Sequence, residues 1–287
     1  MSIVLMNGEF IPRTEAKVDI EDRGYQFGDG IYEVIRVYNS KMFTVKEHLQ
    51  RLLQSSEKLS ISISYSVDEL TQLLEQLIQK NTLDMGFIYM QFTRGVSARN
   101  HSFPETEVAP TFIAYTKEFK RPLSNLEDGV SAITVEDIRW SRCDIKSLNL
   151  LGNVMAKQKA AEADCYESIQ YRDVTVTEGS SSNIWIVKGE KIQTHEASPS
   201  ILNGITRQKL IEISQENGID IEEKAFSIED LIDADEVFLT STTSEVTPIT
   251  EINNVPVKEG KVGEKTRILQ SLFVEAIISE CGELIPQ

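Results

Sequence analysis

The sequence has few cysteines, with Cys143, Cys165 and Cys281 the only three among 287 residues. Their odd number and lack of paired spacing argue against a disulfide framework and a zinc site, and fit a reducing compartment. No apolar stretch is long enough to span a bilayer, and the N-terminal segment turns polar at Asn7-Gly8, too early for a signal peptide. We therefore expect a cytoplasmic protein whose cysteines serve packing.

Basic residues are also scarce, with 29 Lys and Arg against 45 Asp and Glu and a formal net charge of -16. Because no run of Lys or Arg offers a basic patch, we expect neither nucleic acid nor an anionic membrane as a partner. The hydrophobic and charged fractions, 40% and 26%, are those of a folded globular protein. Length alone leaves one large domain or two smaller ones open, and we prefer two.

The first 120 residues alternate strand signals with helical ones. Apolar residues recur every three to four positions over 45–59 and 67–78, which predicts two amphipathic helices. Alternating, β-branched or aromatic runs predict strands on both sides of Asn7-Gly8, over 31–37 and over 87–94. We predict a smaller N-terminal α+β domain, residues 1–120.

A linker is predicted over 117–125, because this stretch is charged, contains Pro122 and lacks periodicity. Residues 121–287 would then form a larger C-terminal α/β domain. Its expected strands are 130–135, 168–172, 174–176, 183–187 and 237–241, and its expected helices are 150–163, 207–216 and 266–279.

Lys146 is the first candidate for chemistry, since its neighbours Ile145, Leu148, Leu150 and Leu151 would surround an amine with apolar side chains. Desolvation penalises the ammonium form, and a neutral amine is the nucleophile that forms an imine with an aldehyde. The alternative is a lysine at a strand end whose ammonium reaches water. This segment alone does not decide between the two.

The run T-V-T-E-G-S-S-S-N, residues 175–183, would end a strand, turn at Gly179 and present Glu178 at the strand end. A carboxylate there could keep a pyridine nitrogen protonated, which would make the ring an electron sink. The alternative is an ordinary polar turn.

The segment L-N-G-I-T-R, residues 202–207, leads into an amphipathic helix whose first N–H groups suit a phosphate. The hydroxyl cluster S-T-T-S, residues 241–244, could add donors, and Arg51 could supply countercharge. Helix caps and a solvated helical arginine explain the same residues.

The loop T-R-G-V-S-A-R-N-H-S-F-P, residues 93–104, carries Arg94, Arg99 and His101 in an otherwise acidic protein. A guanidinium binds a carboxylate through two parallel hydrogen bonds, and a nearby histidine or tyrosine can complete the grip. A plain surface loop is the alternative, because unpaired basic residues are common there.

Taken together, these segments resemble the fold-type IV pyridoxal-phosphate enzymes, and most closely the bacterial D-amino acid aminotransferases. The resemblance spans nearly the whole chain and implies a two-domain fold with the cofactor at the domain interface. It rests on E-D-R-G-Y-Q-F-G-D-G-I-Y-E-V (21–34), R-G-V-S-A-R-N-H-S-F-P (94–104), V-E-D-I-R-W-S-R-C-D-I-K-S-L-N-L-L-G-N (135–153), T-E-G-S-S-S-N (177–183), L-N-G-I-T-R (202–207) and T-S-T-T-S-E-V-T-P (240–248).

The resemblance implies that Lys146 holds pyridoxal 5′-phosphate as an imine and that Glu178 pairs with its pyridine nitrogen. The residues implied for binding the cofactor phosphate are Arg51, Ile205, Thr206, Ser241 and Thr242. Those implied for binding the substrate are Tyr32, Arg99, His101, Ser180 and Ser181, with Arg99 and His101 donated by the neighbouring subunit of a homodimer.

The implied activity is ping-pong transfer of the amino group between D-alanine, D-glutamate or D-aspartate and 2-oxo acids such as 2-oxoglutarate or pyruvate. Such an enzyme would provide D-amino acids for peptidoglycan. Two alternatives share the fold, a branched-chain L-amino acid aminotransferase and an aminodeoxychorismate lyase. A non-enzymatic pyridoxal-phosphate carrier is an alternative of another class, and a purely structural protein is the weakest alternative.

Overall fold

The computed structural model describes residues 2–284, which form two compact units. The first unit contains the chain up to Lys120, the segment Ile145–Asn149 and the residues from Ile277 onward. The second contains Arg121–Asp144 and Leu150–Ala276. Segments 145–149 and 277–284 of the first unit fall within the predicted second domain, 121–287, whose residues 285–287 lie outside the described part of the chain. The structure differs for Ile145–Asn149 because this segment hydrogen-bonds to a strand of the first unit.

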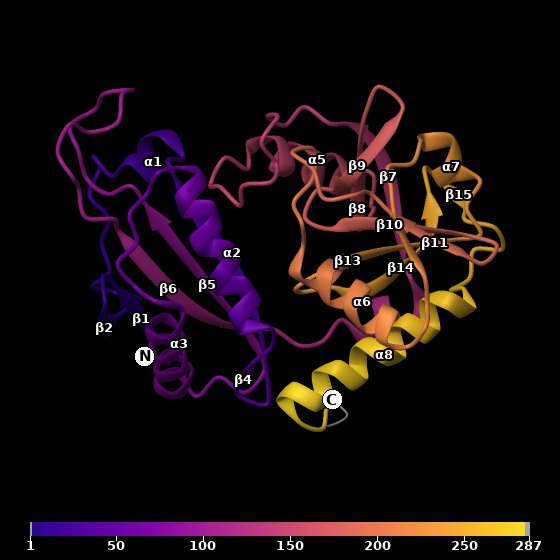
Figure 1. Cartoon of the computed structure of the whole chain (residues 1–287), viewed down its shortest axis with the longest axis horizontal. Helices are drawn as coiled ribbons and strands as arrows, with labels where there is room; N and C mark the ends of the chain where they lie inside the picture. Colours follow the sequence, from indigo (N-terminus) through magenta and orange to yellow (C-terminus); the bar gives the residue numbers. More distant parts are fainter. Residues whose placement is uncertain (1, 285–287) are drawn as a thin grey trace. The chain divides into compact units, whose positions relative to one another are not determined.

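An antiparallel six-stranded sheet forms the centre of the first unit, in the order β2-β1-β6-β5-β3-β4 (Figure 1). Three helices accompany it: α1 (Arg23–Phe27), α2 (Val45–Lys58) and α3 (Val67–Asn81). The strands are β1 (Ile3–Met6), β2 (Glu9–Pro12), β3 (Gly30–Tyr38), β4 (Lys41–Met42), β5 (Gly86–Thr93) and β6 (Phe112–Glu118).

The two faces of this sheet differ because side chains alternate along each strand. On β3, Ile35 and Val37 are fully buried in a core that also contains Leu49 and Leu52 of α2. The opposite face carries a row of aromatic rings: Tyr32 stacks on Tyr89 at 5.7 Å between ring centroids, and Tyr89 stacks on Tyr115 at 5.2 Å.

A nine-stranded mixed sheet forms the second unit, in the order β12-β11-β10-β13-β14-β7-β8-β9, with β15 paired to β14. Only residues 180–182 connect β9 to β10, although these strands are far apart in the order, so the sheet curls until they lie close together. The strands are β7 (Val130–Glu136), β8 (Glu167–Arg172), β9 (Thr175–Gly179), β10 (Asn183–Lys188), β11 (Lys191–Thr194), β12 (Ile221–Glu223), β13 (Glu236–Ser241), β14 (Glu245–Ile252) and β15 (Val255–Pro256).

The helices of the second unit include α5 (Leu151–Glu162), which packs on β7 and β8, and α6 (Ile205–Glu216), which packs on β12 and β13. The others are α4 (Leu123–Asp128), α7 (Ile228–Ile232) and α8 (Glu264–Cys281), whose last turns belong to the first unit. The helices predicted over 150–163, 207–216 and 266–279 are confirmed to within two residues at each end.

The linker predicted over 117–125 is wrong at both ends, because β6 runs to Glu118 and α4 begins at Leu123. Lys117 and Glu118 are exposed, so the end of β6 tolerates charge without losing its pairing with β5. Pro122 stands at the N-cap of α4, and proline suits the start of a helix because the first N–H groups have no intrahelical partner.

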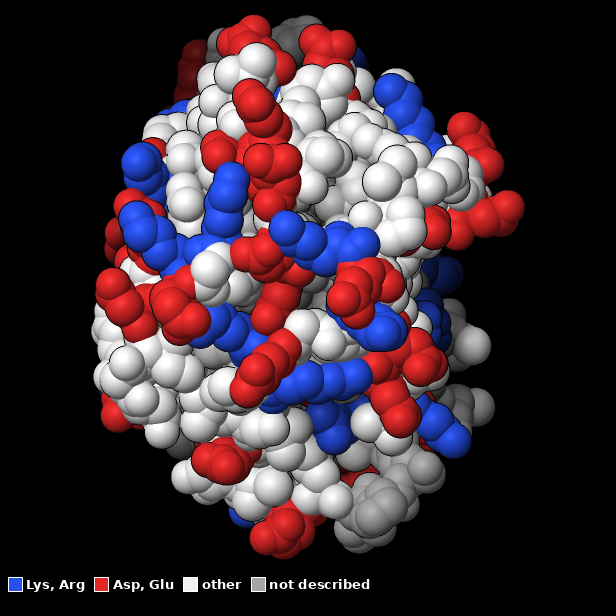
Figure 2. Space-filling model, turned by 90° about the vertical axis from the view of Figure 1, so that its right-hand side faces the viewer, with Lys and Arg blue, Asp and Glu red and all other residues white. Residues whose placement is uncertain are grey.

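The described part of the chain has no helix that combines the length and apolarity needed to cross a membrane. All three cysteines are free, and Cys143 and Cys281 are buried. On the face that Figure 2 shows, Lys and Arg side chains are interspersed with Asp and Glu. Ion pairs at the surface of the second unit include Lys265 with Glu190, at 2.7 Å, and Lys258 with Asp235, at 3.0 Å.

Replacing Leu77 with alanine should lower the free energy of unfolding by about 3 kcal/mol, because this side chain of α3 is fully buried and its removal leaves a cavity. Denaturation in urea measures the change. Gln76→Ala, one residue away and exposed, should change the free energy by less than about 0.5 kcal/mol. Equal effects of the two substitutions would contradict the assignment of the core.

Candidate functional site

Lys146 lies on a short segment that pairs with the beginning of β3. The backbone N–H of Tyr32 donates to the carbonyl of Lys146 at 3.0 Å, and Ser147 forms a bridge with Ile31. The N–H of Leu148 donates to the carbonyl of Gly30 at 2.9 Å. These bonds fix the backbone on both sides of Lys146 against the first unit.

The amine of Lys146 lies over the ring of Tyr32, with Nζ 4.4 Å from the ring centroid. The lysine is half-buried and Ile145 is buried in the core beneath it. The expectation that Leu151 would help to surround the amine is wrong, because Leu151 begins α5 in the second unit and is 74% exposed. An aromatic face therefore replaces part of the predicted aliphatic surroundings.

Arg51 lies on α2 and binds the buried carboxylate of Glu33. Its Nε donates to Oε1 of Glu33 at 2.6 Å and its Nη2 donates to Oε2 at 2.8 Å. Nδ1 of His48 lies 2.8 Å from the same Oε2. Burial alone would raise the pKa of Glu33, but Arg51 and His48 outweigh it and hold the pKa well below its ordinary value. Glu33 is thus ionised and orients the guanidinium.

Arg99 and His101 lie close together in an exposed loop of the first unit, where both contact the ring of Phe27. The guanidinium of Arg99 is 4.6 Å from the ring centroid, and the His101 ring is 5.5 Å away. Arg94, from the same basic motif, is buried and makes a two-bond pair with Asp29. Arg94 is therefore a structural residue, whereas Arg99 and His101 are exposed.

Glu178 lies in the second unit near the end of β9, where three groups donate hydrogen bonds to its carboxylate. Arg139 donates to one carboxylate oxygen through Nη1. The other oxygen accepts from Nδ2 of Asn183 at 3.2 Å and from the N–H of Leu202 at 3.0 Å. Burial raises the pKa of Glu178, while the charge of Arg139 acts to lower it. The hydrogen bonds from Arg139, Asn183 and Leu202 therefore fix the position of the carboxylate.

Asn183 connects Glu178 to the segment that leads into α6. Its Nδ2 also donates to the carbonyl of Leu202 at 2.8 Å. Gly204 is the N-cap of α6, and a Cβ at that position would lie 2.2 Å from Oδ1 of Asn183, so only glycine permits this approach. Ile205 and Thr206 begin the helix, and the first N–H groups of a helix can bind an anion.

Ser241 and Thr242 lie near the same place, because Asn183 pairs with Thr240 across β10 and β13. Ser241 ends β13 and Thr242 follows in the turn, and both are half-buried. The hydroxyl of Ser241 accepts from the N–H of Ser244 at 3.1 Å. The structure therefore brings together, within the second unit, the three segments that were predicted to bind a pyridine nitrogen and a phosphate.

Ser180 and Ser181 differ in their surroundings. Ser180 is buried, and both its hydroxyl and its N–H donate to Oε1 of Glu167. Ser182 donates to Oε2 of the same carboxylate at 2.8 Å. Ser181, between them, is exposed. The hydroxyl of Ser180 thus shapes the turn in this structure, while that of Ser181 faces solvent.

Several residues around the predicted side chains were not found from the sequence. Four of them hydrogen-bond to a predicted residue, and His48 hydrogen-bonds to one of those four, Glu33. The separation in sequence ranges from 5 positions for Asn183 and Glu178 to 39 positions for Arg139 and Glu178. A charged residue in a run of alternating strand residues was the one available signal, and it applied to Glu33. These partners are Glu33, His48, Arg139, Glu167 and Asn183.

The family model "Amino-transferase class IV" matches residues 30–252, more than half of the chain. The chain belongs to the class IV aminotransferases. Two curated relatives of this aminotransferase are D-alanine aminotransferases. That of Staphylococcus aureus (strain MSSA476) is 52% identical over 97% of this chain and 99% of the relative. That of Listeria monocytogenes is 49% identical over 98% of each chain.

Solved structures of the same fold include two branched-chain amino acid aminotransferases. The Escherichia coli enzyme has a TM-score of 0.92 and 28% identity, and covers 100% of this chain and 97% of its own. The enzyme of the archaeon Thermoproteus uzoniensis, solved with norvaline, has a TM-score of 0.88 and 26% identity, covering 98% and 96%. The class IV aminotransferase therefore has the two-domain fold-type IV architecture that the sequence predicted.

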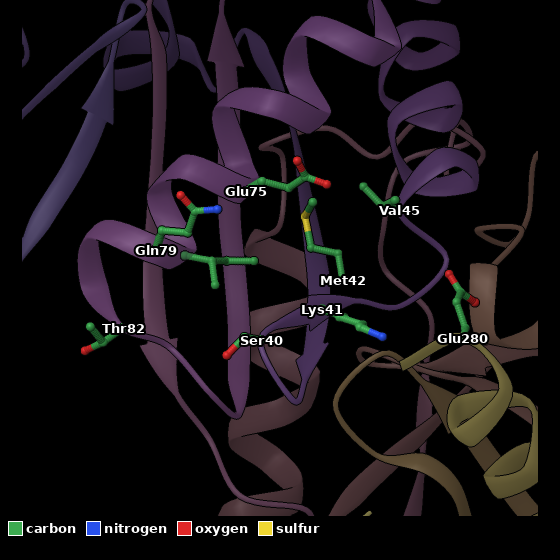
Figure 3. A pocket seen from close by; sticks show the side chains of 9 residues that line it. Ser40, Lys41, Met42, Val45, Glu75, Gln79, Thr82 and Glu280 are labelled. Atoms are coloured by element: carbon green, nitrogen blue, oxygen red, sulfur yellow. The ribbon is translucent and has the colours of Figure 1, made fainter. Parts of the chain in front are cut away.

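A crevice of about 730 Å³ lies elsewhere in the first unit and contains none of the predicted site residues. Its side chains come from α3, from β4 and the turn before it, from the start of α2 and from α8, as Figure 3 shows for Glu75, Lys41, Val45 and Glu280. Among residues 2–284, no group of three or more His, Cys, Asp or Glu could hold a metal ion.

Replacing Glu33 with glutamine should lower the free energy of unfolding at pH 7 by about 3 kcal/mol, because it removes the carboxylate from the buried charge of Arg51. The folded-state pKa of Glu33 lies below the unfolded value, so this contribution is complete above about pH 5 and is lost as the pH falls. Urea denaturation across pH 3–7 should show wild type and E33Q converging in acid. The control is Glu57→Gln, which changes an exposed side chain of α2. A difference in the free energy of unfolding between wild type and E33Q that stays constant with pH would contradict the lowered pKa of Glu33.

Proposed function

We propose that this class IV aminotransferase transfers the amino group of D-alanine, and of D-glutamate and D-aspartate, to 2-oxo acids such as 2-oxoglutarate or pyruvate. Enzymes of the class use pyridoxal 5′-phosphate. The observation that carries the proposal is the half-buried amine of Lys146 over the Tyr32 ring, in a chain about half identical to D-alanine aminotransferases.

The residues fit the chemistry of this cofactor. Lys146 offers an amine for an aldehyde, and Glu178 offers a buried carboxylate for a pyridine nitrogen. For the phosphate, the second unit offers the first N–H groups of α6, whose N-cap glycine at 204 lets Asn183 approach the start of the helix. The proposed phosphate ligands are Ile205, Thr206, Ser241 and Thr242, with Arg51 of the first unit.

Each residue then has a defined task. Bound pyridoxal phosphate supplies an aldehyde carbon for amine exchange and a ring that accepts electrons. Nζ of Lys146 accepts the α-proton of the amino acid as general base and donates a proton as general acid. Glu178 keeps a proton on the pyridine nitrogen. Because one product leaves before the second substrate binds, the kinetics should be ping-pong.

The substrate carboxylate is the proposed ligand of Tyr32, Arg99 and His101. A guanidinium can bind it through two parallel hydrogen bonds, which fixes the direction in which the α-hydrogen points. Ser180 and Ser181 remain proposed substrate contacts, with Ser181 the more accessible of the two. The similarity of fold to branched-chain aminotransferases does not decide the substrate, because one fold serves several activities.

A homodimer is part of the proposal, with Arg99 and His101 completing the site of the neighbouring subunit. Exposed apolar side chains on α5 support an interface, since Leu151, Val154 and Met155 are 74%, 58% and 47% exposed. In the first unit, Ile20 and Tyr25 are exposed at 78% and 77%. We further propose that the enzyme is cytoplasmic and provides D-amino acids for peptidoglycan.

Lys146→Ala should reduce steady-state turnover of D-alanine and 2-oxoglutarate by at least about 10⁴-fold, because both proton transfer and covalent attachment of the cofactor are lost. A coupled assay for pyruvate measures the rate. Lys188→Ala removes an exposed lysine of the second unit and should leave the rate within about twofold. Turnover like that of wild type in the Lys146 variant would refute the role of this lysine.

D-alanine and L-alanine, supplied separately to the yellow holoenzyme without an oxo acid, should differ in the half-reaction. D-alanine should bleach the absorption of the bound cofactor at least about 100 times faster than L-alanine. The reason is that the carboxylate trap orients the α-hydrogen of only one enantiomer toward Lys146. Stopped-flow spectroscopy follows the change. Faster bleaching by L-alanine would favour a branched-chain type of enzyme, and no bleaching by either would favour a cofactor carrier.

A further inference from the structure

The loop that carries Arg99 and His101 has few packing contacts, one of which is the guanidinium of Arg94 over the ring of Phe103, 3.6 Å from its centroid. The side chains of Arg99, Asn100, His101, Ser102 and Phe103 are all exposed. A binding group that must meet a carboxylate at a fixed angle needs a rigid support, and exposed loops have few buried contacts to provide one. The support must therefore come from a neighbouring element.

Arg23, at the first position of α1, makes the contacts that such a support requires. Its Nη1 donates to the carbonyl of Asn100 at 2.6 Å and to that of Ser102 at 3.3 Å. Its Nη2 donates to the carbonyl of His101 at 3.5 Å. One guanidinium thus binds three successive carbonyl groups, in the part of the loop that includes His101.

Arg23 is itself fixed in place. It is 3% exposed, and its Nε donates to Oδ2 of Asp29 at 2.8 Å. Arg94 binds both oxygens of Asp29 and also donates to the carbonyls of Leu59 and Ser60 at 2.8 Å, next to the end of α2. Burial acts to raise the pKa of Asp29, but Arg94 and Arg23 outweigh it and keep the pKa below its ordinary value. The loop is thereby connected to the body of the first unit.

Phe27, one turn further along α1, contacts the side chains of the loop. Its ring centroid lies 4.9 Å from the guanidinium of Arg23 and 4.6 Å from that of Arg99. His101 contacts the same ring at a tilted angle. The half-buried ring is therefore a common platform for both residues proposed to bind the substrate carboxylate.

We propose that Arg23 and Phe27 are positioning residues for the carboxylate trap, with Arg23 fixing the backbone of the loop and Phe27 fixing the side chains of Arg99 and His101. This inference rests on the proposed function, because it names what orients the residues of that site. The inference holds whether the loop completes the site of its own protomer or that of its partner. Lysine cannot replace Arg23, since a single ammonium cannot reproduce the planar fork that binds three carbonyls.

The first test is the half-reaction of the holoenzyme with D-alanine. Arg23→Lys should raise the dissociation constant for D-alanine about tenfold, which is the loss expected for one charged hydrogen bond, and should change the limiting rate by less than about twofold. Lys80→Ala is the matched control, because Lys80 also lies over an aromatic ring of the first unit, that of Phe10, at 4.9 Å. A loss confined to the limiting rate would overturn the proposal.

A double-mutant cycle then asks whether Arg23 acts through the side chains of the trap. If Arg23 only positions Arg99 and His101, adding Arg23→Lys to a variant that already carries Arg99→Lys and His101→Gln should weaken binding of D-alanine by no more than about twofold. A further loss as large as that caused by Arg23→Lys alone would show that Arg23 acts independently of both residues and would overturn the inference.

Hydrogen–deuterium exchange provides a readout that does not depend on activity. Peptides covering 97–104 should exchange faster in Arg23→Lys and in Phe27→Leu than in wild type and Lys80→Ala. If Arg23→Lys does not fold, Phe27→Leu carries both tests. Unchanged exchange in the loop of the variants would refute the inference. If wild type does not react with D-alanine but the loop exchanges faster in the variants, the proposed substrate is refuted and the positioning role remains supported.

Discussion

The pairing of Ile145–Asn149 with the beginning of β3 is the constraint on which the rest of the site depends. Three consecutive positions of β3, from Gly30 to Tyr32, bond or pair with this segment, so the strand that carries Tyr32 also places Lys146. The amine consequently lies over an aromatic ring of the same strand. A lysine far along the chain thus becomes part of the first unit, and the position of its amine depends on the sheet of that unit.

Opposite charges hold the remaining polar side chains in place. Arg51 is oriented by Glu33, and Glu178 by Arg139, while Arg23 and Arg94 share Asp29. Each pair is largely buried, and burying one member alone would be costly, so these pairs give fixed geometry more than added stability. Two of these pairs orient residues proposed to bind the cofactor, Arg51 and Glu178, and the third supports the loop that carries Arg99 and His101.

The sequence predicted the elements with strong periodicity and missed those without it. The β1–β2 hairpin, α2, α3 and α6 were confirmed because apolar spacing or a clear turn residue marks each of them. The short helices α1, α4 and α7 were missed, since five or six residues show no period. The linker over 117–125 was wrong because local charge does not reveal that β6 continues through pairing with β5.

For the candidate site, the sequence supplied the residues that are proposed to bind or react, and the structure supplied their hydrogen-bonding partners. Arg139 contacts Glu178 across 39 positions, and Glu33 contacts Arg51 across 18 positions. Asn183 contacts Glu178 between strands β10 and β9. No local pattern of the sequence encodes such contacts. The expected apolar surroundings of Lys146 were only partly right, because Leu151 follows in sequence but belongs to another unit.

The central claim is that the amine of Lys146 forms the covalent link to the cofactor. Borohydride reduction of the protein loaded with pyridoxal phosphate, followed by proteolysis and mass spectrometry, tests this most directly. The added mass of the reduced cofactor should be found on the peptide that contains Lys146. Labelling of another lysine, or of none, would contradict it.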